Sequence, residues 1–230
     1  MPADAPHSLP PTDADLAATP TFDFDDAAVA AFARDAVAGA TDEVDRARRI
    51  FVAVREAVRY SPYTSNYDRS EFVASTALAS SENWCVPKAI LLTASARAVG
   101  IPARLGFADV RNHLSSERLT AMMGTDLFVY HGYSALFVDG AWRKTSPAFN
   151  AALCERFGTP ALDFDGRTDA LMHAYDGAGR RHMEYVTDHG TYNEMPYDEM
   201  LAAWAEHYDM DRLLAGPADD TTFDDAPAAG

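Results

Sequence analysis

Apolar residues in the first part of the chain recur at the spacing of α-helices. Between residues 25 and 39 they lie three or four positions apart, which predicts a helix that ends near Gly39. A second apolar stripe predicts a helix that has Thr41 as its N-cap and runs to about Tyr60, because Pro62 disfavours helix in the residue before it. Acidic residues in its first turn favour this start, since the N-terminus of a helix carries partial positive charge.

From Ile101 onward the apolar residues alternate as they do in β-strands. Alternation over residues 103–108 predicts one strand. Two further apolar runs, over residues 127–138 and 141–145, flank the pair Asp139-Gly140. Asp-Gly between apolar runs is a strong signal for a two-residue hairpin turn, so we expect these runs to pair as antiparallel strands.

The pattern returns to helix toward the end of the chain. Residues 182–186 are expected to add a strand, and Pro196 opens a last helix that continues through Tyr208. Helices that precede an antiparallel sheet are typical of the α+β class, and no internal repeat or domain linker interrupts them. We therefore expect a single domain over residues 21–214.

Both ends of the chain differ in composition from this domain. Residues 1–20 contain five prolines among Ala and Asp, without the basic and apolar segments of a signal peptide. Residues 215–230 are rich in Asp, Ala and Pro. Both segments are expected to be disordered tails, the second of them acidic. No apolar run is long enough to cross a bilayer, so the sequence predicts a cytoplasmic protein.

Charge narrows the classes of partner. The chain of 230 residues has 35 acidic and 19 basic side chains, a formal net charge of −16. Binding to nucleic acids and anionic membranes depends on Lys and Arg, so neither is an expected partner. Asp supplies 25 of the acids, and only Lys88 and Lys144 are lysines. Such a surface stays hydrated in concentrated salt, and we hypothesise a halophilic protein, which melting temperatures measured against molar salt would test.

Cys85 falls where the pattern predicts the start of another helix. Pro87 fits a first helical turn, and Gly100 followed by Pro102 marks the helix end. At a helix N-terminus the free N–H groups and the dipole favour thiolate over thiol, which makes Cys85 a candidate nucleophile. The alternative is a small buried hydrophobic residue, which is how we interpret Cys154 in its apolar helical surroundings.

A nucleophilic thiol needs a base, and His131 is the strongest candidate. It stands inside an apolar predicted strand, where an idle imidazole is costly to bury. The alternative is a core histidine satisfied by the backbone. His113, just past the first predicted strand, is the second choice of base. The remaining histidines have polar or exposed settings and are expected at the surface: His7, His173, His182, His189 and His207.

The predicted hairpin also indicates which side chains would orient His131. A two-residue turn would place His131 opposite Ala148, with Ser146 and Asn150 as its diagonal neighbours, provided that Pro147 does not end the pairing first. Either side chain can accept a hydrogen bond from the imidazole N–H, Asn150 as in the Cys-His-Asn thiol enzymes.

Two interpretations as ion sites are weaker. The cysteines with His113 and His131 lack the close pairwise spacings of structural zinc sites. Acids at positions 163, 165 and 169 resemble part of a calcium loop, but the regular acid spacing and the closing Glu are missing, so we expect a turn. Neither a metal nor another cofactor is expected.

The segment around Cys85 and the later hairpin together resemble the transglutaminase-like superfamily of thiol enzymes. Its signature is a Cys that opens a helix ending in Leu-Leu-x-Ala-x-x-Arg-Ala-x-Gly-Ile-Pro-Ala-Arg, which residues 91–104 match closely. A strand with His then pairs with a strand that carries Trp and, four residues later, Asp-Pro. His131, Trp142 and Ser146-Pro147 correspond to these positions. The resemblance covers about residues 44–150.

Two positions depart from that signature. Ser146 stands where the family has Asp, so Asn150 or a distant acid such as Asp163 or Asp165 would have to substitute for it. The pair Asn83-Trp84 replaces the common Gly before the nucleophile. Three further stretches are similar to a prokaryotic subgroup of unassigned activity: residues 85–89, 109–113 and 147–150.

The resemblance implies a papain-like core in which the Cys helix packs on an antiparallel sheet. It also implies acyl transfer on an amide or peptide bond through a thioester on Cys85, with hydrolysis as the expected outcome. The Cys85 N–H would hold the oxyanion, helped by the Trp84 indole or a hydroxyl of Tyr60 or Tyr63. On the substrate side of the site we also place Asn83 and His113, and residues 162–193 are expected to cap the cleft. The alternatives are a catalytically silent domain that binds peptides or regulates a partner, and a protein-crosslinking transglutaminase.

Overall fold

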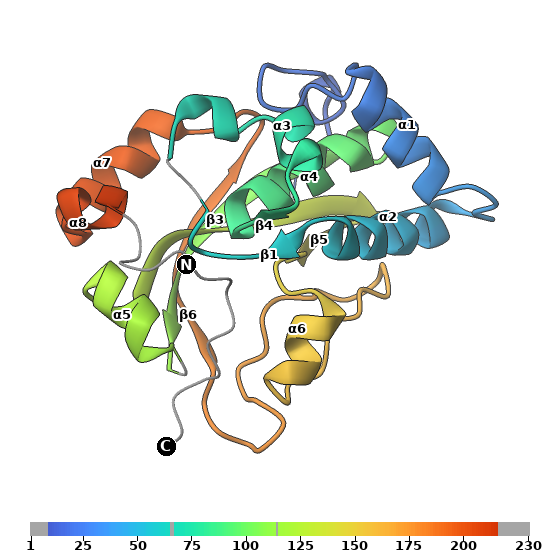
Figure 1. Ribbon diagram of the computed structural model, residues 1–230. Coiled ribbons are helices and arrows are strands. Elements are labelled where there is room, and N and C mark those ends of the chain that lie inside the picture. The colour runs from blue at the N-terminus through green and yellow to red at the C-terminus, as the bar shows by residue number, and fades with distance from the viewer. Residues whose placement is uncertain (1–8, 65–66, 114, 216–230) are drawn as a thin grey trace.

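The structure, a computed structural model, describes residues 9–64, 67–113 and 115–215 (Figure 1). Helices cover a four-stranded antiparallel sheet, which confirms the α+β class predicted from the hydrophobic pattern. Two short strands outside this sheet, β1 (Arg59–Tyr60) and β2 (Glu82–Asn83), pair parallel to each other. β1 lies just after a helix that ends at Ala57, and β2 ends two residues before Cys85, so their pairing brings these two segments side by side.

The main sheet has the strand order β5-β4-β3-β6. Its strands are β3 (Ala103–Asn112), β4 (Leu127–Val138), β5 (Ala141–Thr145) and β6 (Met183–Tyr192). The predicted turn at Asp139-Gly140 is confirmed, since both residues adopt the left-handed conformation that a two-residue hairpin requires, with φ of 52° and 75°. β6 is longer than predicted, and it pairs along most of β3.

The first two helices follow the two predicted stripes. α1 spans Ala27–Ala36, and α2 spans Glu43–Ala57. Asp42 caps α2 by accepting a hydrogen bond of 2.8 Å from the N–H of Asp45, so the expectation that Thr41 is the N-cap is wrong. α2 also ends earlier than predicted, because the residues after it become extended and enter β1.

The helix α4 (Cys85–Ala98) lies at the centre of the molecule. All of its residues from Cys85 to Arg97 are buried, which agrees with a sequence that has no continuous polar face. On one side it packs against β3 and β4, and on the other it contacts α1, α2 and α3 (Ala74–Ala79), which follows a 3-10 helix at Arg69–Glu71 (Figure 1). The prediction that a helix begins at Cys85 is confirmed.

The helices α5, α6, α7 and α8 lie around the sheet (Figure 1). α5 (Glu117–Met123) connects β3 to β4, and α6 (Ala151–Arg156) follows β5. The predicted last helix is confirmed as α7 (Tyr197–His207), with Pro196 as its N-cap, and α8 (Met210–Ala215) continues beyond it. α7 contacts β4, so the end of the described chain returns to the strand that carries His131.

The N-terminal segment corrects one prediction. The described part of the expected disordered tail, residues 9–20, is ordered and contains a 3-10 helix, η2 (Asp13–Asp15). The fully buried carboxylate of Asp15 pairs with the guanidinium of Arg104 through two contacts of 2.6 and 2.9 Å. Burial by itself would raise the pKa of Asp15, but hydrogen bonds from Arg104 and Thr12 bring it below its ordinary value.

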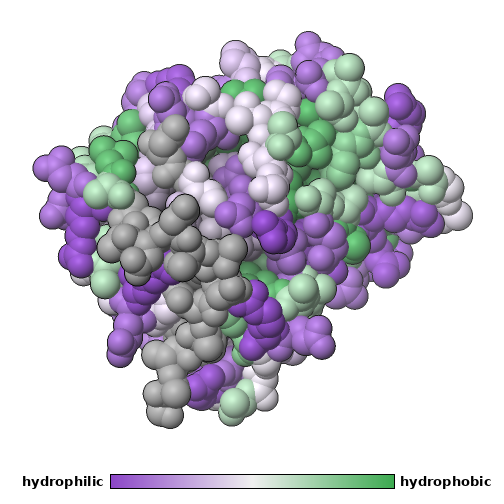
Figure 2. Space-filling view, in the orientation of Figure 1, coloured by the Kyte–Doolittle hydropathy of each residue, from purple (hydrophilic) through white to green (hydrophobic). Residues whose placement is uncertain are grey.

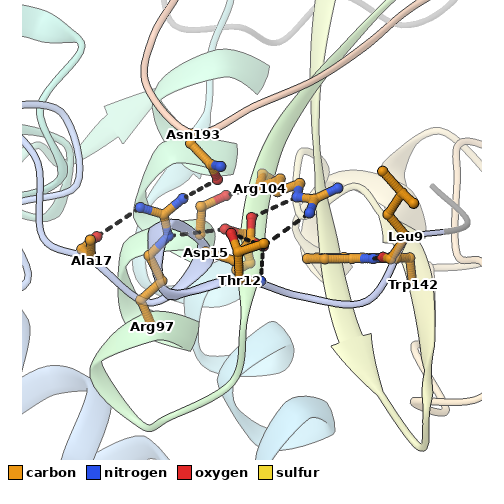
Figure 3. A network of polar contacts seen from close by, with 10 residues as sticks. Leu9, Thr12, Asp15, Ala17, Arg97, Arg104, Trp142 and Asn193 are labelled. Carbon is orange, nitrogen blue, oxygen red and sulfur yellow. Dashed lines mark hydrogen bonds and ion pairs between the residues drawn. The ribbon is translucent and has the colours of Figure 1, made fainter. Parts of the chain in front are cut away.

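A second arginine binds the same segment. Arg97, near the end of α4, donates to the carbonyl of Ala17 at 2.7 Å and to Oδ1 of Asn193 at 3.1 Å (Figure 3). The indole N–H of Trp142 donates to the carbonyl of Leu9 at 2.8 Å. Local composition predicts disorder here, but the buried Arg97, the half-buried Arg104 and Trp142 supply the partners that order the segment.

The predicted C-terminal tail and residues 1–8, with His7, lie outside the described residues. In the part that is described, no helix combines the length and the apolar character needed to cross a membrane. Hydrophilic residues are spread over much of the face shown in Figure 2, and hydrophobic areas lie between them. One such area lies over α1, where Ala27 and Ala28 are exposed.

Candidate active site

Cys85 and His131 line the same pocket. The pocket encloses about 1050 Å³, part of which is open to solvent, and it lies between the start of α4, the strand β4 and the helices α5 and α7. Both side chains are mostly buried, with 6% and 8% of their surface exposed. The structure therefore brings together the two residues that the sequence singled out as nucleophile and base.

Cys85 is the first residue of α4. Trp84 before it is extended, with φ of −102° and ψ of −174°, and its carbonyl accepts the first helical hydrogen bond from the N–H of Lys88 at 3.3 Å. Burial raises the pKa of the Cys85 thiol to about 12, although the backbone N–H groups of Gly132, Val86 and Cys85 act to lower it. The expected thiolate is therefore not the resting form, because loss of hydration outweighs the helix N-terminus.

His131 is neutral for the same physical reason. Burial lowers the pKa of its imidazole to about 4, and Nδ1 is buried without a hydrogen-bond partner. No hydrogen bond joins its ring to any side chain among the described residues, so no third residue completes a triad there. At neutral pH the resting site holds a thiol and an uncharged imidazole.

The backbone beside His131 has an unusual conformation. Ala108 pairs with His131 while Val110 pairs with Phe128, so two residues of β4 face the single residue Asp109 in a β-bulge. One of the two, Tyr130, has a φ of 59°, a left-handed conformation that costs a non-glycine residue about 1 kcal/mol or more. The bulge sets the direction in which β4 continues into His131.

Asp109 and His189 hold this bulge in place. Oδ1 of Asp109 accepts the N–H of Tyr130 at 3.1 Å, and it lies 2.7 Å from Nε2 of His189. The imidazole of His189 stacks on the Tyr130 ring with centroids 4.4 Å apart. No local pattern pointed to a role for Asp109. His189, which was expected at the surface, is half-buried and contacts Asp109. The stretch 109–113 carried a family resemblance but no local sign of this role.

Gly132 restrains the other side of His131. A Cβ atom at this position would lie 2.9 Å from Cα of Val86, which is closer than side-chain carbons approach backbone. The absence of a side chain thus lets β4 pack directly against the first turn of α4. A glycine inside a strand pattern signals such an approach, and it would have pointed to this contact.

Ser146 and Asn150 do not reach His131 as expected. The β4–β5 ladder follows the predicted register only as far as Ser134 and Thr145. Beyond it the Ser146 N–H donates to Ala170 rather than to β4, while the Ser146 hydroxyl is buried without a partner.

The amide of Asn150 is used elsewhere. Its Oδ1 accepts the N–H of Tyr60 at 2.7 Å, and its Nδ2 donates to the carbonyls of Arg55 and Val58, at 3.1 Å for the latter. These carbonyls belong to the end of α2, which Asn150 therefore caps together with Lys88. Asn150 has a structural task that occupies its amide, and the pairing with His131 predicted from the hairpin does not form.

Only some of the residues predicted to bind the oxyanion or the substrate line the pocket. Trp84 and Tyr60 line the pocket, and the indole N–H of Trp84 is buried without a partner. Asn83 lies in β2, where its Oδ1 accepts the N–H of Trp84 at 3.0 Å. His113 is directed away, since its Nε2 pairs with the carboxylate of Glu184 at 2.9 Å and it does not line the pocket.

Another histidine was missed by the sequence analysis. His182, expected at the surface, is buried, lines the pocket and stacks on Phe149 with centroids 6.4 Å apart. Burial lowers its pKa, and its Nδ1 lacks a partner. Of residues 162–193, which were expected to cap the cleft, His182 and Met183 line the pocket, and residues 183–192 form β6.

No group of three or more His, Cys, Asp or Glu side chains within the described ranges is placed to hold a metal ion. Asp165 instead forms a turn, where its Oδ1 accepts the N–H groups of Arg167 and Thr168, each at 2.7 Å. Cys154 is buried in α6, in agreement with its interpretation as a packing residue.

Two comparisons with known proteins find similarity. The family described as the transglutaminase-like superfamily matches residues 30–147, just over half of the chain. A Cytophaga hutchinsonii protein proposed to be a cysteine protease has a solved structure that resembles this one with a TM-score of 0.45 and 14% sequence identity. That match covers 77% of this chain and 53% of the other, so the chain spans about half the length of that protein. A search of curated proteins gives no match.

Proposed function

The chain belongs to the transglutaminase-like superfamily of thiol enzymes, and from this premise we propose that Cys85 accepts an acyl group from an amide or peptide bond. The observation that carries the proposal is the meeting of Cys85, at the start of α4, and His131, beside a bulge of β4, in one pocket. Hydrolysis of the resulting thioester is the proposed outcome.

The reaction begins with a proton transfer because both groups are neutral at rest. The thiol proton passes to the imidazole of His131 while the sulfur electron pair forms a bond to the carbonyl carbon. The electrons of the C=O π bond move to oxygen, and in the proposal the backbone N–H of Cys85 donates a hydrogen bond to this oxyanion. The oxyanion then collapses, the C–N bond breaks, and the imidazolium gives its proton to the departing amine.

The thioester is removed by a second addition. Water attacks its carbonyl carbon as His131 takes a proton from that water, and the C–S bond breaks to release the acid. The imidazolium returns its proton to the sulfur and restores the neutral pair. An amine in place of water would give the transglutaminase reaction, in which a new amide leaves the enzyme.

We propose that Cys85 and His131 act as a catalytic dyad and not as part of a triad. The orphaned Nδ1 of His131 supports this, since neither Ser146 nor Asn150 hydrogen-bonds the ring. In the proposal, the orientation of the imidazole comes from the backbone on either side, through the bulge at Tyr130 and the tight contact at Gly132.

One observation favours a second candidate function. A thiol with a pKa near 12 beside an imidazole with a pKa near 4 is poorly activated, as in a domain that keeps its cleft only to bind a peptide or regulate a partner. In such a domain Cys85 would carry no acyl group at any stage.

Intact-mass measurement during incubation with peptide amides and activated esters distinguishes these functions. An acyl adduct is expected on the wild type and on the matched variant Cys154→Ala, which removes the other cysteine, and not on Cys85→Ala. His131→Ala is expected to slow acylation by about 100-fold or more, the range of general acid–base catalysis. A primary amine added to the reaction separates hydrolysis from transamidation by the product formed. If no adduct depends on Cys85 and no substrate is turned over, the proposed enzyme function is rejected in favour of the second candidate, a binding domain.

A further inference from the structure

The pocket around Cys85 is aromatic and carries no formal charge of its own. Of the 22 lining residues that the structure describes, nine are Phe, Tyr or Trp, and none is Asp, Glu, Lys or Arg. Acidic and basic residues make up 23% of the chain, which has a net charge of −16. Their absence from this lining shows that the pocket differs in chemistry from the rest of the protein.

The polar ends of two wall residues are occupied by backbone. The indole N–H of Trp204 donates to the carbonyl of Val129 at 2.9 Å. The hydroxyl of Tyr208 donates to the carbonyl of Leu127 at 3.2 Å and accepts the N–H of Val129 at 2.5 Å. Because these groups are engaged with β4, the two side chains offer the pocket mainly the faces and edges of their rings.

Charged side chains close to the pocket along the strands are paired with other groups. Asp109 follows Ala108, the residue of β3 that pairs with His131. Its carboxylate contacts His189 and the N–H of Tyr130. Glu184 of β6, next to the lining residue Met183, pairs with His113. Neither carboxylate belongs to the lining, so a ligand beside Cys85 meets no counter-ion there among the described residues.

The ionisable groups of the lining report the same environment. Burial is the first cause of every shift resolved there: it raises the pKa of the Cys85 thiol and of four tyrosines, and it lowers the pKa of His131 and His182. Each shift disfavours the charged form. A charged ligand group in this pocket would lose its hydration in the same way.

We propose that this pocket binds an uncharged acyl group whose side chain is aromatic or branched aliphatic, and that it discriminates against acyl groups with a charged side chain. Aromatic walls offer such a side chain apolar area to bury and ring edges to pack against. A charged side chain would be desolvated without a partner. The part of the inference that names an acyl group rests on the proposed function. The preference for apolar ligands depends on the pocket alone.

Two sets of matched probes test the inference. The first set is N-acetyl aminoacyl chloromethyl ketones of Phe, Leu, Glu and Lys, with labelling of Cys85 followed by intact mass and each rate divided by that with free cysteine. The Phe and Leu probes are expected to label at least about tenfold faster than the Glu and Lys probes, which corresponds to a difference of about 1.4 kcal/mol. High ionic strength screens the attraction of the cationic probe to a protein of charge −16.

The second set lacks the reactive group. Binding of N-acetyl amides of the same four amino acids is followed by tryptophan fluorescence, since Trp84 and Trp204 line the pocket. Preferential binding of the Phe and Leu amides without any labelling of Cys85, even by iodoacetamide, would sustain the inference and overturn the proposed function. Equal or faster labelling by the charged probes, or equal binding of all four amides, would overturn the inference and leave the function standing.

A charge placed in the pocket provides a matched variant. Met123 is a half-buried lining residue in the last turn of α5, where a helix tolerates Lys well. Met123→Lys is expected to raise labelling by the Glu probe several-fold relative to the Phe probe. Val52→Lys adds the same charge at an exposed position of α2 that does not line the pocket, and it is expected to leave the ratio unchanged. The same change of ratio in both variants would mean that net charge, not the lining, governs the selection.

Discussion

Lys88 allows the energetic cost of a buried amine to be measured. Its side chain is fully buried three residues after Cys85, and its Nζ donates to the carbonyls of Arg55, at 2.9 Å, and Val58 at the end of α2. Burial lowers the pKa of the amine from 10.5 to about 7. A neutral amine keeps two N–H donors, so both carbonyls remain satisfied when the proton is lost.

The sign of the pH dependence follows from proton binding. Between pH 7 and 10.5 the unfolded chain holds the Lys88 proton while the folded protein has lost it, so the free energy of unfolding rises with pH in this window. The two pKa values give a gain of about 2 kcal/mol between pH 7 and pH 9, against a limit of about 1.4 kcal/mol per pH unit. Substitution Lys88→Met keeps the length of the side chain and removes the titration.

Urea unfolding at pH 7, 8 and 9 measures the effect. The stability of the wild type minus that of Lys88→Met is expected to increase by about 2 kcal/mol across this range. Every other titrating group is common to both proteins, and Asn150 still donates to the same carbonyls in the variant. The matched control Lys144→Met removes the other lysine, which is half-buried and paired with Asp188, and should keep the wild-type slope. A constant difference between the wild type and Lys88→Met would refute the reasoning.

Two further predictions concern packing and the N-terminal segment. Gly132→Ala places a methyl group within 2.9 Å of Cα of Val86. The substitution is therefore expected to destabilise the fold by about 1–3 kcal/mol, measured by urea unfolding, and to slow any reaction of Cys85. Unchanged stability would show that β4 can move away from α4. Asp15→Ala removes the fully buried carboxylate that pairs with the guanidinium of the half-buried Arg104, and it is expected to cost about 3–5 kcal/mol. Asp13→Ala, at an exposed position of the same 3-10 helix, should cost less than about 0.5 kcal/mol, and equal losses in the two variants would show that the ion pair does not stabilise the fold.

Local patterns were sufficient for most of the secondary structure. The Asp139-Gly140 turn predicts the register of β4 and β5 because hairpin pairing is set by the turn itself, and the ladder follows it to Thr145. The extrapolation to Asn150 failed for a non-local reason. Its amide is bound by Tyr60 and by the end of α2, about ninety residues earlier in the chain, and no pattern around position 150 reveals those partners.

The candidate site shows the same division between local and tertiary causes. Sequence reasoning found Cys85 and His131, since a helix start and an apolar strand are local features. It did not reveal the burial that raises the pKa of Cys85, because the helix N-terminus is visible in the sequence while this burial comes from tertiary packing. Asp109 escaped notice because the bulge it holds is formed by pairing with a strand about twenty residues later.

The buried, protonated thiol of Cys85 also has consequences for oxidation. Peroxides and disulfides react with thiolates, so a thiol whose pKa is raised by burial is oxidised slowly. Cys154, the other cysteine, is buried in α6 with a raised pKa and is likewise a poor target. The burial that raises the pKa of Cys85 is thus also expected to slow the oxidation of its sulfur.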